Sequence, residues 1–315
     1  MQRGWRPGGG AVMKNEKRMN SAVRREAVAG YLFIMPFIIG FLAFSAIPIL
    51  ISLYLSFTEY DVLGSPKFIG LQNYIRMFTA DPKVWKTFGV TFFYAAVSVP
   101  LKLIMALAVA MLFLKNTRFT GFMRGVYYLP SIMGGSIAVA VLWRRLFASD
   151  GVINALMALV GLPGDIAWLG RKDTAIWTLI ILAVWQFGSS MLIFLAGLKQ
   201  IPASLYEAAT VDGGSRFRQF ISITLPMLTP VLFFNLVQQT INAFMAFTQS
   251  FVITGGGPRD STRFYCVYQY QRAFEFHEMG YASAMAWFML VVIGILTALI
   301  FQSSTRWVYN ESKEG

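Results

Sequence analysis

The polar stretch Leu198–Leu225, which lies between two long apolar runs, holds the first group of side chains that are suited to binding another molecule. Its centre places the carboxylate of Glu207 directly before the small residues Ala208 and Ala209. A carboxylate can bind basic groups or backbone amides of a partner, and small neighbours allow that partner to approach closely. This combination indicates docking against another protein rather than catalysis. We call the stretch the elbow.

The elbow is expected to fold as two short helices separated by a turn. Pro202 suits a helix start, and residues 205–211 can be helical. Gly213 and Gly214 break the helix, and Ser215 can cap the one that follows.

A second group of polar residues lies in the apolar run after the elbow. At 100° per residue its five amide side chains fall within roughly 60° of one direction, as one stripe along a helix. Amides offer donors and acceptors, which suits a neutral polyhydroxylated ligand better than an ion. The alternative is hydrogen bonding between helices. We assign to the substrate path the stripe and two residues that open the last apolar run: Asn235, Gln238, Gln239, Asn242, Gln249, Tyr281 and Ser283.

Other polar residues within apolar runs have simpler explanations. Gln186, Ser189 and Ser190 form a short polar face that favours hydrogen bonding between helices. Lys102 is costly in a bilayer, so we expect a structural role in which it reaches the interface or a carbonyl freed by Pro100.

Composition identifies the elements that must position these residues. The chain has 315 residues, 56% hydrophobic and 13% charged, against about 45–50% and 25% for soluble domains. It is therefore an all-α membrane protein, and its apolar runs predict six spanning helices. These runs are Tyr31–Phe57, Thr87–Leu114, Phe122–Trp143, Thr174–Gly197, Pro226–Ile253 and Tyr281–Phe301.

The domain organisation follows from these runs. Residues 1–28 form a basic tail, 29–85 the first spanning helix with its outer loop, 86–305 a core that holds the other five spans, and 306–315 a second tail. The first apolar run is much longer than the 7–15 residues of a signal peptide's apolar region, so we expect it to be retained.

The distribution of basic residues predicts the orientation. Lys and Arg are dense in the N-terminal segment and in the short loop 115–125, which predicts that both of these segments lie in the cytoplasm. Both termini and the elbow then face the cytoplasm too. The net charge of +12 thus reflects membrane topology rather than nucleic-acid binding.

Several classes of function are excluded or disfavoured. The single Cys266 forbids an internal disulfide, and the single His277 leaves no zinc cluster, so we expect no metal site. No Walker A pattern occurs, so the chain needs no cofactor of its own and does not hydrolyse ATP by that route. A secondary transporter would need intramembrane acids, and the predicted spans contain none.

The elbow carries a family resemblance. Glu207-Ala208-Ala209, then Gly213 and Ile223-Thr224-Leu225-Pro226, resembles the EAA motif (EAA-x3-G-x9-I-x-LP) at every fixed position. This motif marks the permease subunits of binding-protein-dependent ABC importers. Three further segments resemble the carbohydrate-uptake branch of that family: residues 127–130 (YYLP), 251–258 (FVITGGGP) and 279–284 (MGYASA).

The resemblance implies a type I ABC importer permease fold, with the elbow as a cytoplasmic coupling helix, in the bacterial cytoplasmic membrane. It implies as partners a second homologous permease, a cytoplasmic ATPase dimer that uses ATP and Mg²⁺, and an extracytoplasmic solute-binding protein, which Arg272, Glu275 and Glu278 could meet. The implied function is ATP-driven import of a sugar or sugar derivative. A non-sugar polar solute and a secondary transporter remain the alternatives. The residues expected to couple to the ATPase are Glu207, Ala208, Ala209, Asp212 and Gly213.

Overall fold

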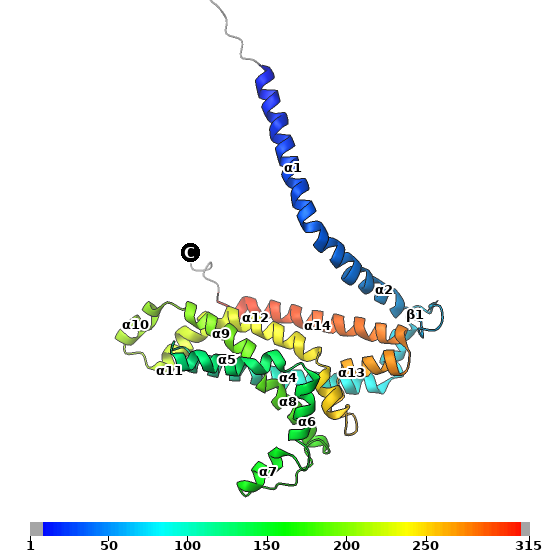
Figure 1. Cartoon of the computed structure of the whole chain (residues 1–315), viewed down its shortest axis with the longest axis vertical. Helices are drawn as coiled ribbons and strands as arrows, with labels where there is room; N and C mark the ends of the chain where they lie inside the picture. The colour runs from blue at the N-terminus through cyan, green and yellow to red at the C-terminus, as the bar shows by residue number, and fades with distance from the viewer. Residues whose placement is uncertain (1–8, 310–315) are drawn as a thin grey trace, which may run out of the picture. The chain divides into compact units, whose positions relative to one another are not determined.

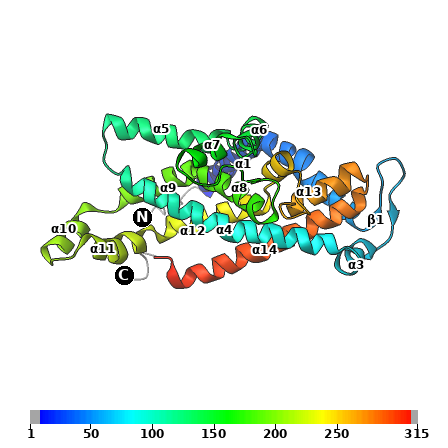
Figure 2. The same ribbon diagram turned by 90° about the horizontal axis from the view of Figure 1, so that it is seen from below.

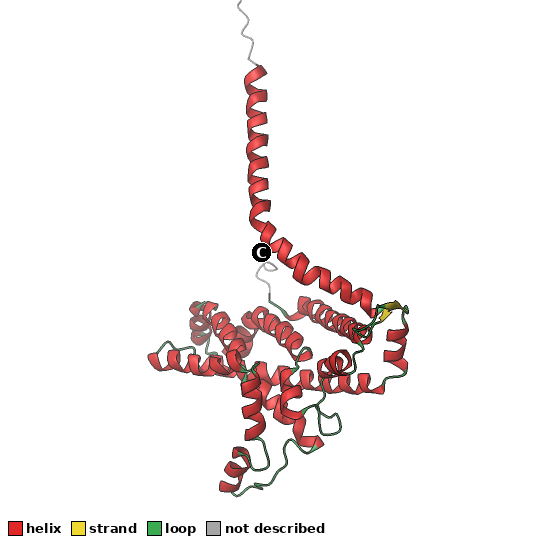
Figure 3. Cartoon of the chain, turned by 45° about the vertical axis from the view of Figure 1, so that its right-hand side comes forward, coloured by secondary structure: helices red, strands yellow, loops and turns green. Residues whose placement is uncertain are grey.

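The computed structural model describes the backbone of residues 9–309 and the side chains from residue 25 onward. The chain divides into two compact units, Met1–Leu55 and Ser56–Gly315. Helices dominate the described part, and one short hairpin supplies its only sheet (Figure 3).

The first unit is one long helical segment. It consists of α1 (Gly9–Phe41), a π-helical turn η1 (Leu42–Ala46) and α2 (Ile47–Ser56), whose last residue already belongs to the second unit. Residues 25–56 are long and apolar enough to cross a membrane. The basic tail expected at 1–28 is therefore helical from Gly9, while residues 1–8 lie outside the described part.

The second unit is built around α4 (Pro82–Leu112), which packs against α8 (Lys172–Trp185), α9 (Gly188–Gln200) and α12 (Leu225–Phe244). On its far side α12 packs against α14 (Met279–Trp307) (Figures 1 and 2). Apolar side chains of these helices form one contiguous core. The C-terminal tail expected from residue 306 begins inside α14, and residues 310–315 lie outside the described part.

The described helices give four membrane spans, or six if each of two bent pairs counts as one. The fourth predicted span is α8 and α9, bent by 41°. The third is α5 (Arg118–Met133) and α6 (Ile137–Leu146), bent by 101°, so the expectation of one continuous helix there is wrong. The break falls at Gly134 and Gly135, and the Ser136 hydroxyl accepts a hydrogen bond from Val139 N at 3.3 Å, which starts a new helix.

The two ends of the second unit differ. At one end lies the elbow, with α10 (Ala203–Val211), α11 (Arg216–Gln219) and the π-helical turn η2 (Phe220–Thr224) (Figure 2). At the other end the antiparallel strands β1 (Thr58–Glu59) and β2 (Lys67–Phe68) pair with Thr58 opposite Phe68. We call these the elbow end and the hairpin end.

The long connections contain structure that the sequence did not predict. The connection before the second span holds the hairpin and α3 (Gln72–Thr79), where Asn73 Nδ2 donates to the carbonyls of Ser56 at 3.0 Å and Thr58 at 2.9 Å. The other connections hold three further elements: α7 (Val152–Leu159), α13 (Tyr265–Tyr270) and the π-helical turn η4 (Gln271–Glu275). A last π-helical turn, η3 (Gln249–Thr254), closes the fifth span.

Candidate functional site

The elbow folds as its sequence predicts. Helix α10 follows Pro202 and ends where the Gly214 amide donates to the Ala209 carbonyl at 2.8 Å. Between them Gly213 has φ +76°, a left-handed conformation that glycine adopts without a side-chain clash. The Ser215 hydroxyl accepts from the Arg218 amide at 3.3 Å and so caps α11.

Side chains hold the two short helices together as one body. Gln219 Nε2 donates to Thr210 Oγ1 at 3.0 Å and to the Gly214 carbonyl at 3.1 Å. The Tyr206 hydroxyl lies 2.9 Å from Thr224 Oγ1, which joins α10 to the start of the following span. Helix α10 is therefore tied to the start of that span by a side-chain contact as well as by the chain itself.

The elbow presents unpaired carboxylates beside apolar side chains. Glu207 and Asp212 are exposed, and neither forms an ion pair or a side-chain hydrogen bond within the described residues. Val211 is 87% and Phe217 72% exposed in the single chain. Of the small residues expected to couple, Ala208 and Gly213 are exposed and Ala209 is half-buried.

A small polar cavity lies inside the second unit. Its volume is about 100 Å³, and three of the five stripe amides line it: Gln239, Asn242 and Gln249. Asn235 is buried outside the lining, where its Nδ2 donates to the Val231 carbonyl at 3.2 Å, and Gln238 is exposed. Neither Tyr281 nor Ser283 lines the cavity.

The opposite wall of the polar cavity comes from other helices. Tyr94, Ser98 and Lys102 of α4 line it, together with Gln186 at the break between α8 and α9. The Gln186 side chain also donates to the Gly134 carbonyl at 3.0 Å, which confirms the expected hydrogen bonding between helices. By contrast, the buried Ser190 hydroxyl has no hydrogen-bond partner among the described residues.

Sequence reasoning missed the place of Lys102. No hydrogen bond from its ammonium to a carbonyl is found within residues 25–309, so the expected contact with a carbonyl freed by Pro100 is wrong. The lysine lines the same cavity as the amide stripe. Its position inside an apolar run was visible in the sequence, but its neighbours on α12 were not.

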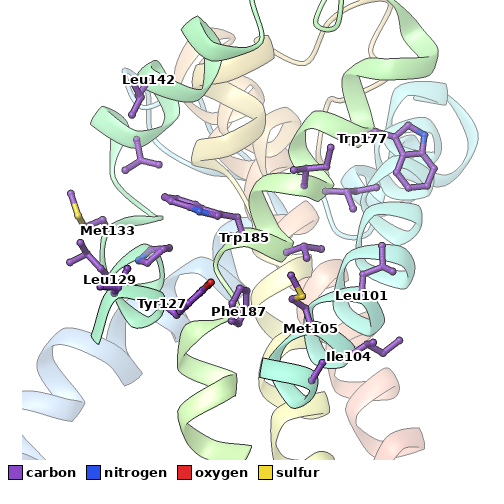
Figure 4. Close-up of a pocket in the computed structure, with 17 residues that line it drawn as sticks. Leu101, Ile104, Met105, Tyr127, Leu129, Met133, Leu142, Trp177, Trp185 and Phe187 are labelled. Atoms are coloured by element: carbon purple, nitrogen blue, oxygen red, sulfur yellow. The ribbon is translucent and has the colours of Figure 1, made fainter. Parts of the chain in front are cut away.

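A larger apolar recess of about 1040 Å³ lies between α4, α5, α6 and α8. Figure 4 shows Tyr127, Trp185 and Phe187 on one side and Leu101 with Met105 on α4. Nearly every lining residue is apolar, so the recess offers a sugar few hydrogen-bonding partners. It suits lipid or another apolar helix better than a polar solute.

At the hairpin end, Asp81 is the centre of an ionic cluster. Its carboxylate is 6% exposed and accepts hydrogen bonds from the hydroxyls of Tyr268 at 2.7 Å and Tyr281 at 2.9 Å. Arg272 lies 3.1 Å away. Burial alone would raise the pKa of Asp81, but these hydrogen bonds and the charge of Arg272 outweigh it and hold the pKa below its ordinary value of 3.8.

The cluster extends to Arg76 and Glu278. Glu278 pairs with Arg76 at 2.9 Å and with Arg272 at 3.1 Å. We call these residues, with Asp81, Tyr268 and Tyr281, the Asp81 cluster. The sequence suggested that Arg272, Glu275 and Glu278 could contact a binding protein. In the structure Arg272 and Glu278 form ion pairs within the chain, whereas Glu275 is exposed.

Within the described residues, no group of three or more His, Cys, Asp or Glu side chains is arranged to hold a metal ion. Cys266 is half-buried, and its thiol donates to the Phe244 carbonyl at 3.5 Å. The polar cavity and the elbow are accordingly the two candidate sites.

Comparison with known proteins identifies relatives along nearly the whole chain. Residues 77–309 match the family described as binding-protein-dependent transport system inner membrane component. The chain is 53% identical over 309 residues to the probable ABC transporter permease protein YesP of Bacillus subtilis (strain 168), covering 98% of this chain and 99% of YesP. It is 37% identical over 242 residues to the trehalose/maltose transport system permease protein MalF of Thermococcus litoralis, covering 76% and 81%.

A solved structure shares the fold. A chain in the crystal structure of a bacterial alginate ABC transporter, in complex with an alginate pentasaccharide-bound periplasmic protein, matches with a TM-score of 0.78 at 22% identity. The match covers 92% of this chain and 98% of that one. The helices described above therefore form a type I importer permease fold.

Proposed function

This chain belongs to the family of binding-protein-dependent transport system inner membrane components, and we propose that it is the permease subunit of an ATP-driven saccharide importer. It is a multi-pass membrane protein and not an enzyme. We infer that it pairs with a second homologous permease, an ATPase dimer and a soluble solute-binding protein. The maltose and alginate systems among its relatives and structural neighbours support a saccharide as substrate.

The elbow is the observation that carries this proposal. It is a rigid body of two short helices at one end of the bundle, with the Glu207 carboxylate free to bind another protein. A separate ATPase needs such a handle, because coupling requires a contact whose geometry changes between two states. We propose that Glu207, Ala208, Ala209, Asp212 and Gly213 form this contact.

The orientation follows from the same assignment. An ATPase works in the cytoplasm, so the elbow end and both termini face that side, and the hairpin end faces outward. The basic residues between the second and third spans support this by the positive-inside rule: Lys115 lies in the loop after α4, and Arg118 and Arg124 lie in the first two turns of α5. We propose that the solute-binding protein docks on the hairpin end.

The polar cavity is proposed as the closed substrate path. Its amides can donate to and accept from sugar hydroxyls. At about 100 Å³ the cavity is smaller than the 300–1,000 Å³ of typical ligand pockets, so passage of a sugar requires the helices to separate. ATP-driven movement of the elbow would supply that separation.

Two alternatives predict different behaviour. An importer of a non-sugar polar solute would use the same cavity and elbow. A panel of solutes tested on the reconstituted importer distinguishes it from a saccharide importer. A secondary transporter would work without an ATPase and would need acids in its path for ion coupling, whereas no Asp or Glu lines the polar cavity.

The test is reconstitution of the chain with its partner permease, ATPase and binding protein in proteoliposomes. A panel of mono- and oligosaccharides, with amino acids and dipeptides as non-sugar solutes, is screened for stimulated ATP hydrolysis and for uptake. Stimulation by a saccharide is expected only when all four components are present. Solute uptake by this chain without the ATPase, or stimulation by a non-sugar solute alone, would overturn the proposal.

A further inference from the structure

We propose that the transported saccharide carries a carboxylate and that Lys102 binds this carboxylate in the substrate path. The inference rests on the proposed function, since it specifies the charge of the sugar that the polar cavity admits. It begins from the one charged side chain among the residues that line the cavity.

Lys102 lies well inside the membrane-spanning part of α4, twenty residues after Pro82 and ten before Leu112 at the elbow end. Its cavity neighbours on and after α12 are Gln239, Asn242 and Gln249. Lys102 thus lines the same cavity as the amide stripe, and its position in the chain is far from both ends of the span, from which a lysine usually extends its ammonium to the membrane surface.

The described part of the chain gives Lys102 no negative partner. No Asp or Glu lines the cavity, and within residues 25–309 the ammonium makes neither an ion pair nor a hydrogen bond. A lysine inside a membrane span is costly, and such residues pair with a partner or mark the path of a substrate. Since the described residues provide no such pairing, the geometry favours a substrate.

The ligand chemistry follows from these groups. A lysine ammonium is a compact charge with three donors, and the three amides offer both donors and acceptors. A uronate sugar presents one carboxylate and several hydroxyls, which match one ammonium and several amides. A phosphate monoester carries about −1.5 to −2 charges, more than a single lysine balances. A carboxylated saccharide is therefore favoured over a phosphorylated one.

The complete importer in proteoliposomes tests this with three probes. Digalacturonate and α-1,4-galactobiose have the same sugar ring and the same linkage, but the first carries carboxylates where the second carries hydroxymethyl groups. Galactose 6-phosphate supplies a phosphate monoester. Uptake of digalacturonate well above the other two is expected. Uptake of galactobiose without digalacturonate overturns the inference and leaves the proposed function standing, and so does preference for the phosphate. Uptake of none of the three counts against both.

Substitutions locate the effect. Lys102→Gln is expected to lower digalacturonate uptake on the order of tenfold to a hundredfold, the effect of losing one charged hydrogen bond. Lys102→Arg should retain most uptake, because the charge remains. Lys115→Gln is the matched control on an exposed lysine outside the cavity, and it should leave uptake unchanged. Equal digalacturonate uptake by wild type and Lys102→Gln overturns the assignment. If Lys102→Gln does not assemble, Lys102→Met, which keeps the length of the side chain without its charge, takes its place with the same expected loss and the same overturning result.

Discussion

The guanidinium of Arg272 lies 3.1 Å from the carboxylate of Asp81, although the two residues are 191 positions apart. Asp81 precedes α4, Arg272 lies in η4, and Tyr281 near the start of α14 donates to the same carboxylate oxygen at 2.9 Å. Two regions that are distant in the sequence, the start of α4 and the stretch from η4 to α14, therefore meet at one buried charge. This contact organises the hairpin end.

The first prediction concerns Asp81→Asn. It removes the charge opposite Arg272 with little change of shape, and breaking a buried pair costs about 3 kcal/mol. We expect a fall of several degrees in the apparent Tm of the purified protein in detergent. The matched control is Asp150→Asn, whose partner Arg145 is 74% exposed, so the apparent Tm should hardly move. Equal shifts for both variants would show that the cluster adds no stability.

The second prediction is the pH dependence of that contribution. The pKa of Asp81 is below 3.8 in the folded protein, so in acid the unfolded chain binds more protons. The stabilisation is fully present above the unfolded value and is lost as the pH falls through the lower folded value. The difference in apparent Tm between wild type and Asp81→Asn should be constant from about pH 5 to 8 and shrink below about pH 4. A difference that varies across the neutral range would contradict this assignment.

The third prediction concerns the exposed elbow carboxylate. Glu207→Arg reverses a charge that makes no contact within the described residues, so the chain should fold and insert normally. Substrate-stimulated ATP hydrolysis in the reconstituted importer should be abolished, because the proposed contact with the ATPase becomes repulsive. Gln302→Arg, which places the same side chain at an exposed position of α14, is the control and should retain stimulation. Full stimulation of Glu207→Arg would remove Glu207 from the coupling contact.

The fourth prediction separates conformation from bulk at Gly213. A Cβ added there meets no atom within 4 Å, but the φ of +76° is left-handed. Gly213→Ala should cost about 1–2 kcal/mol for that conformation, and Gly213→Asn less, since asparagine visits it more readily. Stimulated ATP hydrolysis should accordingly be highest in the wild type, lower in Gly213→Asn and lowest in Gly213→Ala. Equal loss in both variants would indicate that bulk at the ATPase contact matters instead.

The fifth prediction tests packing at the break in the fourth span. A Cβ on Gly188 would lie 2.2 Å from the Tyr127 carbonyl and 2.7 Å from Tyr128 Cα, both backbone atoms of α5. Gly188→Ala should therefore force α5 and α9 apart, at a cost of about 1–3 kcal/mol. Gly125→Ala on α5 meets nothing within 4 Å and should be neutral or slightly stabilising. Similar apparent Tm values for the two variants would contradict the close approach.

Local structure and family membership could both be predicted from the amino-acid sequence alone. Pro202, the glycine pair and Ser215 shape the elbow through their own backbone preferences, and the structure confirms each of them. Long apolar runs located the spans, because a helix in lipid satisfies its hydrogen bonds internally whatever its neighbours are. The match over residues 77–309 agrees with the resemblance carried by the EAA spacing.

Which distant residues meet could not be predicted from the sequence and became known from the folded structure. It placed Lys102 beside three amides more than 130 positions away, joined Asp81 to Arg272, and bent α5 and α6 by 101°. Periodicity reports which face of a helix is polar, but not which helix packs against that face or in what register. Those choices depend on side-chain packing between segments, such as the close approach at Gly188, and no single segment encodes them.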